Sequence, residues 1–397
     1  MPANWTRFKI EDIATIRGGG TPSRSEAAYF GGEIPWVTPT DLAPIGKIMH
    51  LGDVAQKLTD AGLQNSSAKL IPAGSVLFSS RASIGKIAVT DSECATNQGF
   101  INLSPKADKV CPWFLAFLLR RYTRELIQLA GKTTFLEIPR GKFKEFEVSI
   151  PPLLEQHRIV NRIKECMERV EEIENLANAA QQEVAALFPA ILNERFAEIR
   201  KLHGYRLLED IADIRGGSSL PKGSEEDGGK KSVLLVKVGD MNIDGNERVI
   251  ELSREYLPSQ GAGRGLIPVG AVIFPKRGGA IATNKKRLLG RPALIDPNLM
   301  AVVANPKHLS AAYLYYWSKT IDLAKLSNGG VIPQLNRKDL APLKLPIPNL
   351  DAQRPIVESL QSAEEYCGRL LAEFQKAQAE RIQLREAILR NAFAGEH

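Results

Sequence analysis

Two stretches of the chain concentrate positive charge without any acidic residue and could therefore contact an anionic partner. Residues 276–291 read KRGGAIATNKKRLLGR and contain six cationic residues, and residues 61–90 contain three. Residues 131–144, GKTTFLEIPRGKFK, add four more. Lys and Arg side chains on Gly-rich or polar loops can reach the phosphates of DNA. A solvated basic loop without a partner is the alternative interpretation.

Some of these side chains are of the types that read base edges in the major groove, namely Arg, Asn and Gln. Arg81, Arg277, Gln98, Gln334 and Asn336 are the candidates for base contacts, and the lysines are assigned to phosphates. Arg81 and Arg277 end similar segments, IPAGSVLFSSR and IPVGAVIFPKR, so both could instead be shared backbone-contacting or structural residues. The predicted DNA-contacting residues are Arg24, Arg81, Lys86, Gln98, Lys132, Arg140, Lys142, Lys276, Arg277, Lys285, Lys286, Arg287, Gln334, Asn336 and Arg337.

No catalytic motif accompanies these residues. The chain contains no N-P-P-[YFW] tetrapeptide, no G-x-x-x-x-G-K-[ST] phosphate loop and no G-x-G-x-x-G. Its five histidines are scattered and match no Ser or Cys signature of a hydrolytic triad. Four widely spaced cysteines form no C-x-x-C pair, so we expect no metal. The sequence therefore predicts a protein that is not an enzyme by itself, although an enzyme with an unrecognised site is an alternative.

Composition is compatible with a nucleic-acid partner. The 397 residues carry a formal net charge of +7, with a pI near 9.1, which mildly favours a polyanionic partner. The longest apolar runs, such as FLAFLL at 114–119, fall far short of the roughly 20 residues that cross a bilayer. The first residues do not resemble a signal peptide. We therefore expect a cytoplasmic protein that does not bind membranes.

The chain contains a long internal repeat. EDIATIRGG at 11–19 returns as EDIADIRGG at 209–217, with eight of nine positions identical. FEVSIPPLLEQHRIV at 146–160 and AILNERFA at 190–197 return near the end of the chain as LKLPIPNLDAQRPIV and AILRNAFA. A period near 197 residues is too long for a solenoid and indicates the tandem duplication of a whole domain. The glycines that end the first repeated segment are expected to allow a tight turn.

Each repeat begins with a globular part of mixed secondary structure. Short β-branched or aromatic runs such as SVLFSS and KIAVT, or VLLVKV and AVIFP, are bounded by turn residues and predict strands. One helical stretch interrupts each globular part, at 111–130 and 310–326. The predicted fold class is α+β, with two tandem-duplicated mixed α/β domains at residues 1–152 and 200–349.

Each repeat then ends in a long helix, at 153–199 and 350–397. Apolar residues recur there at steps of three and four, so the two helices are predicted to pair as an antiparallel coiled coil. Residues 153–188 alone would span about 54 Å. Pro189 is expected to kink or end the first helix. The predicted interface residues are Val160, Ile163, Met167, Val170, Ile173, Val184, Leu187, Val357, Leu360, Leu370 and Phe374.

The order of these motifs resembles the specificity subunit of type I restriction-modification enzymes. The resemblance rests on IRGGGTPSR (16–24), IPWVTPTDL (34–42), IPAGSVLFSSRASIGK (71–86), TNQGF (96–100) and IPPLLEQHRIV before a long helix, together with their duplication. It covers essentially the whole chain. The second half is the weaker match, because IRGGSSLPK lacks the Thr-Pro-Ser of the first half and TNQG has no clear counterpart near residue 299.

The resemblance implies a specific division of labour. Each globular part would be a target recognition domain that reads one half of a bipartite, asymmetric site in double-stranded DNA, and the helices would set the spacer. The helices would also dock two methyltransferase subunits, and restriction subunits would join the assembly through them. No cofactor is expected on this chain, because S-adenosylmethionine and ATP would bind the partner subunits. A helical scaffold or adaptor that does not read DNA is the alternative function.

Overall fold

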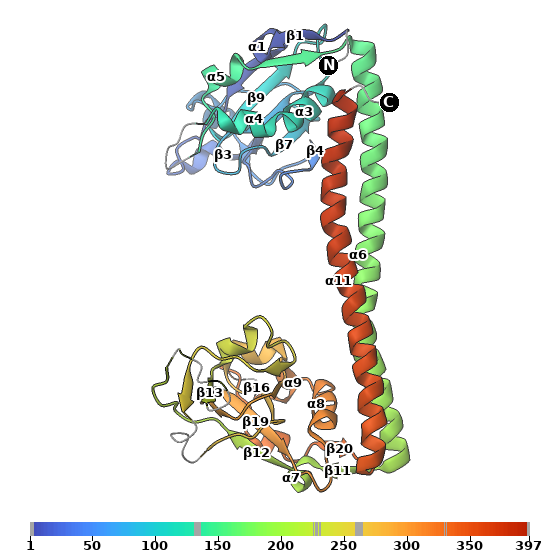
Figure 1. Ribbon diagram of the computed structural model, residues 1–397. Helices are drawn as coiled ribbons and strands as arrows, with labels where there is room; N and C mark the ends of the chain where they lie inside the picture. Colours follow the sequence, from blue (N-terminus) through green and yellow to red (C-terminus); the bar gives the residue numbers. More distant parts are fainter. Residues whose placement is uncertain are drawn as a thin grey trace. The chain divides into compact units, whose positions relative to one another are not determined.

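The computed structural model describes residues 4–130, 136–224, 226, 229, 232–258, 265–328, 330 and 332–394. The chain divides into two compact units, the first formed by Met1–Leu176 with Ala377–His397 and the second by Ala177–Lys376. Each unit combines a globular domain with segments of two long helices, α6 (Leu153–His203) and α11 (Leu350–Ala394) (Figure 1). We describe each unit by itself.

The globular domain of the first unit is built around a five-stranded sheet in the order β2-β9-β6-β7-β4. A three-stranded sheet, β5-β3-β8, and a two-stranded sheet, β1-β10, complete it. The central strands consist largely of β-branched and aromatic residues and are buried on both faces. The elements are β1 (Thr6–Lys9), α1 (Ile10–Ile13), β2 (Ala14–Gly18), η1 (Ala27–Tyr29), β3 (Phe30–Val37), β4 (Ile48–Leu51), β5 (Lys57–Leu58), α2 (Asp60–Gln64), β6 (Val76–Ser79), β7 (Ile87–Thr90), β8 (Ala95–Thr96), β9 (Phe100–Pro105), α3 (Pro112–Arg121), α4 (Thr123–Gln128), α5 (Arg140–Lys144) and β10 (Glu147–Ile150).

The second unit repeats this arrangement strand for strand. Its sheets have the orders β12-β19-β16-β17-β14, β15-β13-β18 and β11-β20. This identity confirms the duplicated mixed α/β fold that the repeat predicts. The elements are β11 (Tyr205–Leu207), α7 (Leu208–Ile211), β12 (Ala212–Gly216), β13 (Ser232–Val236), η3 (Val238–Asn242), β14 (Val249–Ile250), β15 (Tyr256–Pro258), β16 (Val272–Pro275), η5 (Gly278–Thr283), β17 (Arg287–Leu289), β18 (Ala293–Ile295), β19 (Leu299–Ala304), α8 (Ala311–Lys319), α9 (Leu323–Leu326), α10 (Arg337–Leu340) and β20 (Lys344–Pro346).

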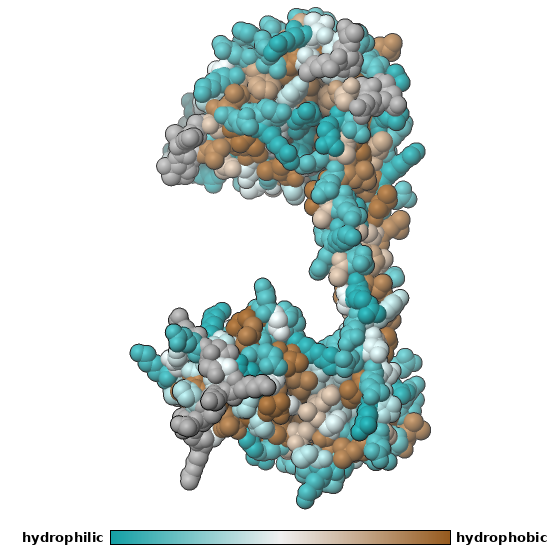
Figure 2. Space-filling model, in the orientation of Figure 1, coloured by the Kyte–Doolittle hydropathy of each residue, from teal (hydrophilic) through white to brown (hydrophobic). Residues whose placement is uncertain are grey.

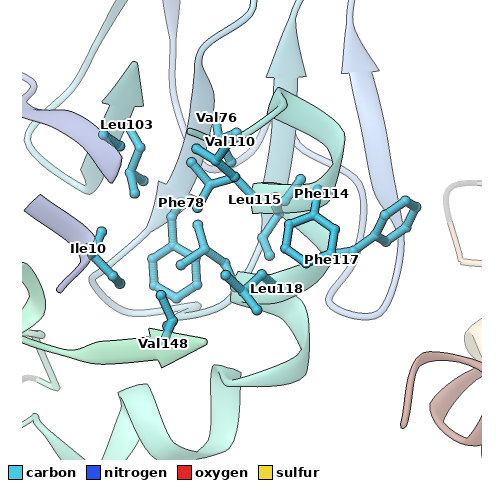
Figure 3. Close-up of a cluster of buried hydrophobic side chains, with 14 of the residues drawn as sticks. Ile10, Val76, Phe78, Leu103, Val110, Phe114, Leu115, Phe117, Leu118 and Val148 are labelled. Carbon is cyan, nitrogen blue, oxygen red and sulfur yellow. The ribbon is translucent and has the colours of Figure 1, made fainter. Parts of the chain in front are cut away.

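One apolar helix forms the centre of each domain core. In the first unit, α3 begins with Pro112 at its first position, where a missing N–H costs no helical hydrogen bond. Its residues 114–119 are all buried. Figure 3 shows Phe114, Leu115 and Leu118 of this helix gathered with Val76 and Phe78 of β6 in one cluster of buried side chains. In the second unit, residues 313–317 of α8 take the corresponding place.

The two long helices run antiparallel. In the first unit, Val160 and Ile163 near the start of α6 share the domain core with Leu389 near the end of α11. Further along, the Arg385 guanidinium donates two hydrogen bonds to the Glu174 carboxylate, at 2.9 and 2.8 Å. In the second unit, residues near the end of α6 share a cluster with Leu360 near the start of α11. The pairing direction is therefore the one that the apolar seams predict.

The predicted seam residues are buried to different extents. Val160, Ile163, Val170 and Leu360 are buried, whereas Met167, Val184, Val357, Leu370 and Phe374 are half-buried. Ile173 and Leu187 remain 50% and 41% exposed, so they contribute little to the packed surface between the helices.

Pro189 does not end the first helix. Helix α6 continues past this residue to His203. A proline removes one backbone hydrogen bond and clashes with the preceding turn. The residues that follow it offset this cost, because Leu192, Phe196 and Ile199 are buried in the core of the second unit.

A buried glutamine fixes the start of each long helix to its own domain. The Gln156 side chain is fully buried; its Oε1 accepts from the Cys111 N–H at 2.9 Å, and its Nε2 donates to the carbonyls of Lys109 and Pro151. Gln353 makes the same three bonds in the second unit, to the Ser310 N–H and to the carbonyls of residues 308 and 348. In each unit, one amide thus joins the segment before the core helix to the first turn of the long helix.

This arrangement predicts a strong local effect of Gln156→Leu. The change leaves one backbone N–H and two carbonyls without their partner in a buried site, which should lower the free energy of unfolding by about 2–4 kcal/mol. Gln353→Leu should cost a similar amount, whereas Gln182→Leu, at an exposed position of α6, should cost little. Chemical denaturation of the purified variants measures these values. Equal stability of the Gln156 and Gln182 variants would contradict the structural role of the amide.

Candidate nucleic-acid interface

The loops that carry the predicted contact residues leave the same end of the five-stranded sheet in the first unit. The last residues of β2 and β6 pair with the first residues of β9, because Gly18 lies opposite Ile101 and Ser79 opposite Phe100. The first residue of β7, Ile87, also lies at this end, opposite Phe78. Residues 19–26, 80–86 and 97–99 therefore extend from one sheet end, which we call the loop end.

Residues 136–140 join this end through backbone hydrogen bonds. The Ile138 N–H donates to the Ser80 carbonyl at 3.0 Å, and Arg81 and Glu137 are antiparallel bridge partners. The Arg81 side chain donates from Nε and Nη2 to one carboxylate oxygen of Glu137, at 3.0 and 2.6 Å. Both side chains remain about half exposed.

The Arg140 guanidinium lies directly against the backbone of Gly18. A Cβ atom added to Gly18 would stand 1.9 Å from Nη2 of Arg140, so a larger residue there would displace the guanidinium. In the second unit, a Cβ atom on Gly216 would stand 3.2 Å from Nζ of Lys276. Gly18 and Gly216 end equivalent strands, β2 and β12. Both domains thus hold a cation over the same glycine, although the two cations come from different positions of the repeat.

The other predicted residues of the first unit differ in how far their side chains already form hydrogen bonds within the domain. Lys86 donates from Nζ to the Pro39 carbonyl at 2.7 Å, so its charge is partly engaged within the domain. The exposed Gln98 side chain accepts from the Thr21 hydroxyl. Arg24 and Lys142 are exposed to solvent. Lys132 lies outside the described residues.

The loop end of the second unit is assembled in the same way. Gly216 pairs with Met300, Pro275 with Leu299 and Ile273 with Arg287. Residues 276–286 therefore leave the sheet at this end, and residues 332–336 join them, because the Leu335 N–H donates to the Lys276 carbonyl at 2.8 Å. The structure brings the predicted residues Lys276, Arg277, Lys285, Gln334, Asn336 and Arg337 into this region.

In the second unit, Arg277 and Gln334 take the places that Arg81 and Glu137 have in the first, so an amide replaces the carboxylate. They are antiparallel bridge partners at the equivalent place. The Gln334 side chain donates to Oδ1 of Asn336 at 3.1 Å, and the Asn336 N–H donates to Asp339 at the start of α10. Arg277 is exposed, and no hydrogen bond or ion pair of its side chain occurs among the described residues. Asn336 is thus partly committed to the local fold, whereas Arg277 is available to a ligand.

The position of Lys286 does not fit the predicted phosphate contact. Lys286 is only 3% exposed, and its Nζ donates to the Ile321 carbonyl and to Oδ1 of Asn284. Burial lowers the pKa of Lys286 from 10.5 to about 8. We therefore assign Lys286 a structural role and not a DNA contact, because its hydrogen bonds connect the residue before β17 to the segment after α8. Its half-exposed neighbour Lys285 donates to Oδ1 of Asn242.

Arg287 is similarly restricted. Its Nη1 donates to the Lys286 carbonyl at 3.0 Å, and burial lowers the pKa of its guanidinium.

Glu137 is the loop-end residue that the sequence prediction missed. The repeat places Glu137 opposite Gln334 with an offset of 197 residues, so the alignment of the two halves contained the signal.

Two further searches of the described residues bear on the type of site. Within these ranges, no three His, Cys, Asp or Glu side chains are grouped to hold a metal ion. No helix in the described part of the chain is long and apolar enough to cross a membrane.

Sequence comparison relates the chain to a known family. The model of the family described as the type I restriction modification DNA specificity domain matches residues 2–182 and 204–380. The MjaIX specificity subunit of a type I restriction enzyme from Methanocaldococcus jannaschii is 32% identical over 238 residues, which cover 56% of this chain and 55% of that protein. The HindI specificity subunit from Haemophilus influenzae is 26% identical over 38% of this chain and 33% of that protein. The matched regions thus span about half or less of these relatives.

Two solved structures have the same fold. A chain in a structure that addresses complex assembly and conformational transition of the type I R-M system matches with a TM-score of 0.79 and 22% identity, over 100% of this chain and 99% of that chain. The HsdS subunit from Thermoanaerobacter tengcongensis matches with a TM-score of 0.62 and 21% identity, over 100% and 98% of the two chains. At these identities the similarity demonstrates the architecture.

The burial of Lys286 predicts a dependence of stability on pH. In the folded protein this lysine loses its proton near pH 8, whereas in the unfolded chain it keeps the proton up to its ordinary pKa of 10.5. Between these values the unfolded state binds more protons, so this residue makes the free energy of unfolding rise with pH. Denaturation at several pH values should show this rise in the natural protein and a smaller rise in Lys286→Met. Lys285→Ala is the control and should retain it, and identical pH profiles for the natural protein and Lys286→Met would contradict the burial.

Proposed function

Because the chain belongs to the type I restriction modification DNA specificity family, we propose that it is the DNA-recognition subunit of a type I restriction-modification complex. Residues 1–152 and 200–349 are the two target recognition domains, and each reads one half of a bipartite, asymmetric site in double-stranded DNA. The observation that carries this proposal is the convergence of cationic and amide side chains at the loop end of both duplicated sheets. The activity belongs to the cytoplasm, where such a site in chromosomal DNA is accessible.

The two domains share phosphate contacts and differ in base contacts. Arg140 and Lys276, held over equivalent glycines, are suited to fix each domain on the DNA backbone. Arg277 and Gln98 are exposed and of the types that read base edges. The shared cations explain how two domains with different loops can bind DNA in the same orientation, and the differing loops explain an asymmetric target.

The helices at 153–199 and 350–397 act as the spacer between the half-sites. This part of the proposal is supported by the continuity of α6 from Leu153 to His203 and by the Glu174–Arg385 ion pair, which is mostly buried. A continuous helix resists bending, so its length fixes a distance better than a loop does.

The same helices offer a surface for protein partners. Large apolar side chains are exposed along them, among them Leu176, at 66%, and Ile382, at 59%. Figure 2 shows hydrophobic residues on the outer surface of the helices. Exposed apolar surface of this kind typically marks a protein interface. We propose that two methyltransferase subunits dock here, that restriction subunits join through them, and that S-adenosylmethionine and ATP bind these partners.

The main test is exchange of one recognition domain. Residues 1–152 are replaced by the corresponding domain of a relative, the chain is produced with its methyltransferase partner, and the methylated sequences are mapped. We expect one half of the target to change, because each domain carries its own loop end, while the other half and the spacer stay the same. The reciprocal exchange of residues 200–349 is the matched control and should change only the other half.

Two outcomes would contradict the proposal. A change in both half-sites after a single exchange would exclude independent recognition domains. Binding of the methyltransferase partner without any sequence-dependent, salt-sensitive binding of DNA would favour the alternative, a helical adaptor.

The spacer role predicts the effect of paired insertions. Four residues added after Ala180 in α6 and four after Lys376 in α11 lengthen each helix by about 6 Å and nearly preserve the phase of its apolar seam. Since B-DNA rises about 3.4 Å per base pair, the spacer should grow by one or two base pairs with unchanged half-sites. Insertions of two residues rotate each seam by about 200° and should abolish activity. The measurement is again the mapped methylation motif, and an unchanged spacer after the four-residue insertions would show that the helices do not set the distance.

A further inference from the structure

Arg81 and Glu137 form a cross-strand pair whose geometry is set by the backbone. Hydrogen bonds on both sides hold the two segments together, from the Ile138 N–H to the Ser80 carbonyl at 3.0 Å and from the Ala82 N–H to the Leu136 carbonyl at 3.4 Å. Residues opposite each other in such a bridge project their side chains to the same face. The backbone of the loop end therefore places Arg81 and Glu137 side by side, which allows their side chains to form the ion pair.

The ion pair occupies only one edge of the guanidinium. Glu137 accepts hydrogen bonds from Nε and Nη2 of Arg81, at 3.0 and 2.6 Å, through a single oxygen, Oε2. A guanidinium has five N–H donors, so the edge formed by Nη1 and Nη2 keeps its donors. That edge matches the O6 and N7 acceptors of guanine in the major groove. The Arg81 side chain is 45% exposed, so it lies at the surface where a ligand can approach.

The second unit has the same backbone arrangement without the charge. The Leu335 N–H donates to the Lys276 carbonyl and the Gly278 N–H to the Pro333 carbonyl, both at 2.8 Å, so Arg277 and Gln334 face each other as Arg81 and Glu137 do. The amide of Gln334 instead donates to Asn336. Arg81 is thus held by a carboxylate, whereas no carboxylate among the described residues holds its counterpart Arg277.

We propose that Glu137 is a positioning residue that orients Arg81 to read a guanine in the first half-site, and that Arg277 takes its orientation only on the DNA. This inference rests on the proposed function. A side chain that is already oriented loses less rotamer freedom on binding, which sharpens the preference for the base that matches its free edge. The carboxylate also repels nearby phosphates, which weakens binding to unrelated DNA. The first effect strengthens binding to the matching target and the second weakens binding to unrelated DNA, so both raise discrimination.

The test compares four variants of the full chain, each purified with its methyltransferase partner. Methylation mapping first defines the target of the natural complex. Competition binding at fixed salt then compares this target with duplexes that each carry one base-pair change. The variants are Arg81→Ala, Glu137→Ala, Glu137→Gln and the matched control Glu145→Ala, which removes an exposed acid at the end of α5.

Arg81→Ala and Glu137→Ala should both lose discrimination, by about tenfold, at the same single guanine of the first half-site. Glu137→Ala should also bind unrelated DNA more tightly. Glu137→Gln should recover part of the discrimination, because its amide oxygen still accepts from Arg81. Glu145→Ala should change the affinity for all duplexes equally. Thermal unfolding of each variant verifies that it is folded.

Unchanged discrimination in Glu137→Ala would overturn the inference, and equal strengthening of binding to every duplex would show that Glu137 only masks the charge of Arg81. Loss of discrimination in Glu137→Ala at a base pair that Arg81→Ala leaves intact would also overturn it. If the natural complex shows no sequence preference, the proposed function itself fails. If the natural complex reads its target and all four variants match it, the roles of Arg81 and Glu137 are both rejected, while the proposed function of the chain stands.

Discussion

The direction of each long helix depends on one buried amide. Apolar contacts between a helix and a domain are not directional, so by themselves they leave some freedom in the exact position and rotation of the helix. Gln156 and Gln353 remove this freedom, because each must satisfy one N–H and two carbonyls at once from a fully buried position. These hydrogen bonds act on the first turn of the helix. A small change in the direction of that turn would become a large displacement at the far end of the helix.

The sheet separates the residues that hold the fold from those that meet a ligand. The apolar core lies along β6, β9 and α3, whereas the variable side chains leave the loop end. A substitution of an exposed residue at the loop end, such as Arg277, therefore exchanges one exposed contact for another and leaves the core unchanged. This separation explains how Glu137 and Gln334 can differ between two units with the same strand order. Recognition can diverge quickly on such a scaffold while stability is retained.

The sequence predicted the features that depend on periodicity and order, namely the duplication, the mixed domains and the two long helices. It did not predict features that depend on contacts between distant segments. Lys286 resembles its neighbour Lys285 in every local respect, and only the carbonyl of Ile321 and the side chain of Asn284 make it an interior residue. The sequence also does not show that α6 continues past Pro189, which it does because the apolar residues beyond it are buried in the core of the second unit. Glu137 lies 56 residues from Arg81 in the chain, and only the bridge between their two segments brings the side chains together.

The cations over Gly18 and Gly216 have a consequence for how such proteins are related to one another. Arg140 approaches its glycine from the start of α5, whereas Lys276 approaches from the end of β16. A column-by-column alignment of the two halves pairs Arg140 with Arg337 but Lys276 with Ser80, so the alignment alone does not show which residue carries the charge over the glycine. The positive charge over this glycine thus recurs at one location in space and not at one position of the repeat. Two copies of one domain can thus place the same charge over the same glycine with residues that do not align with each other.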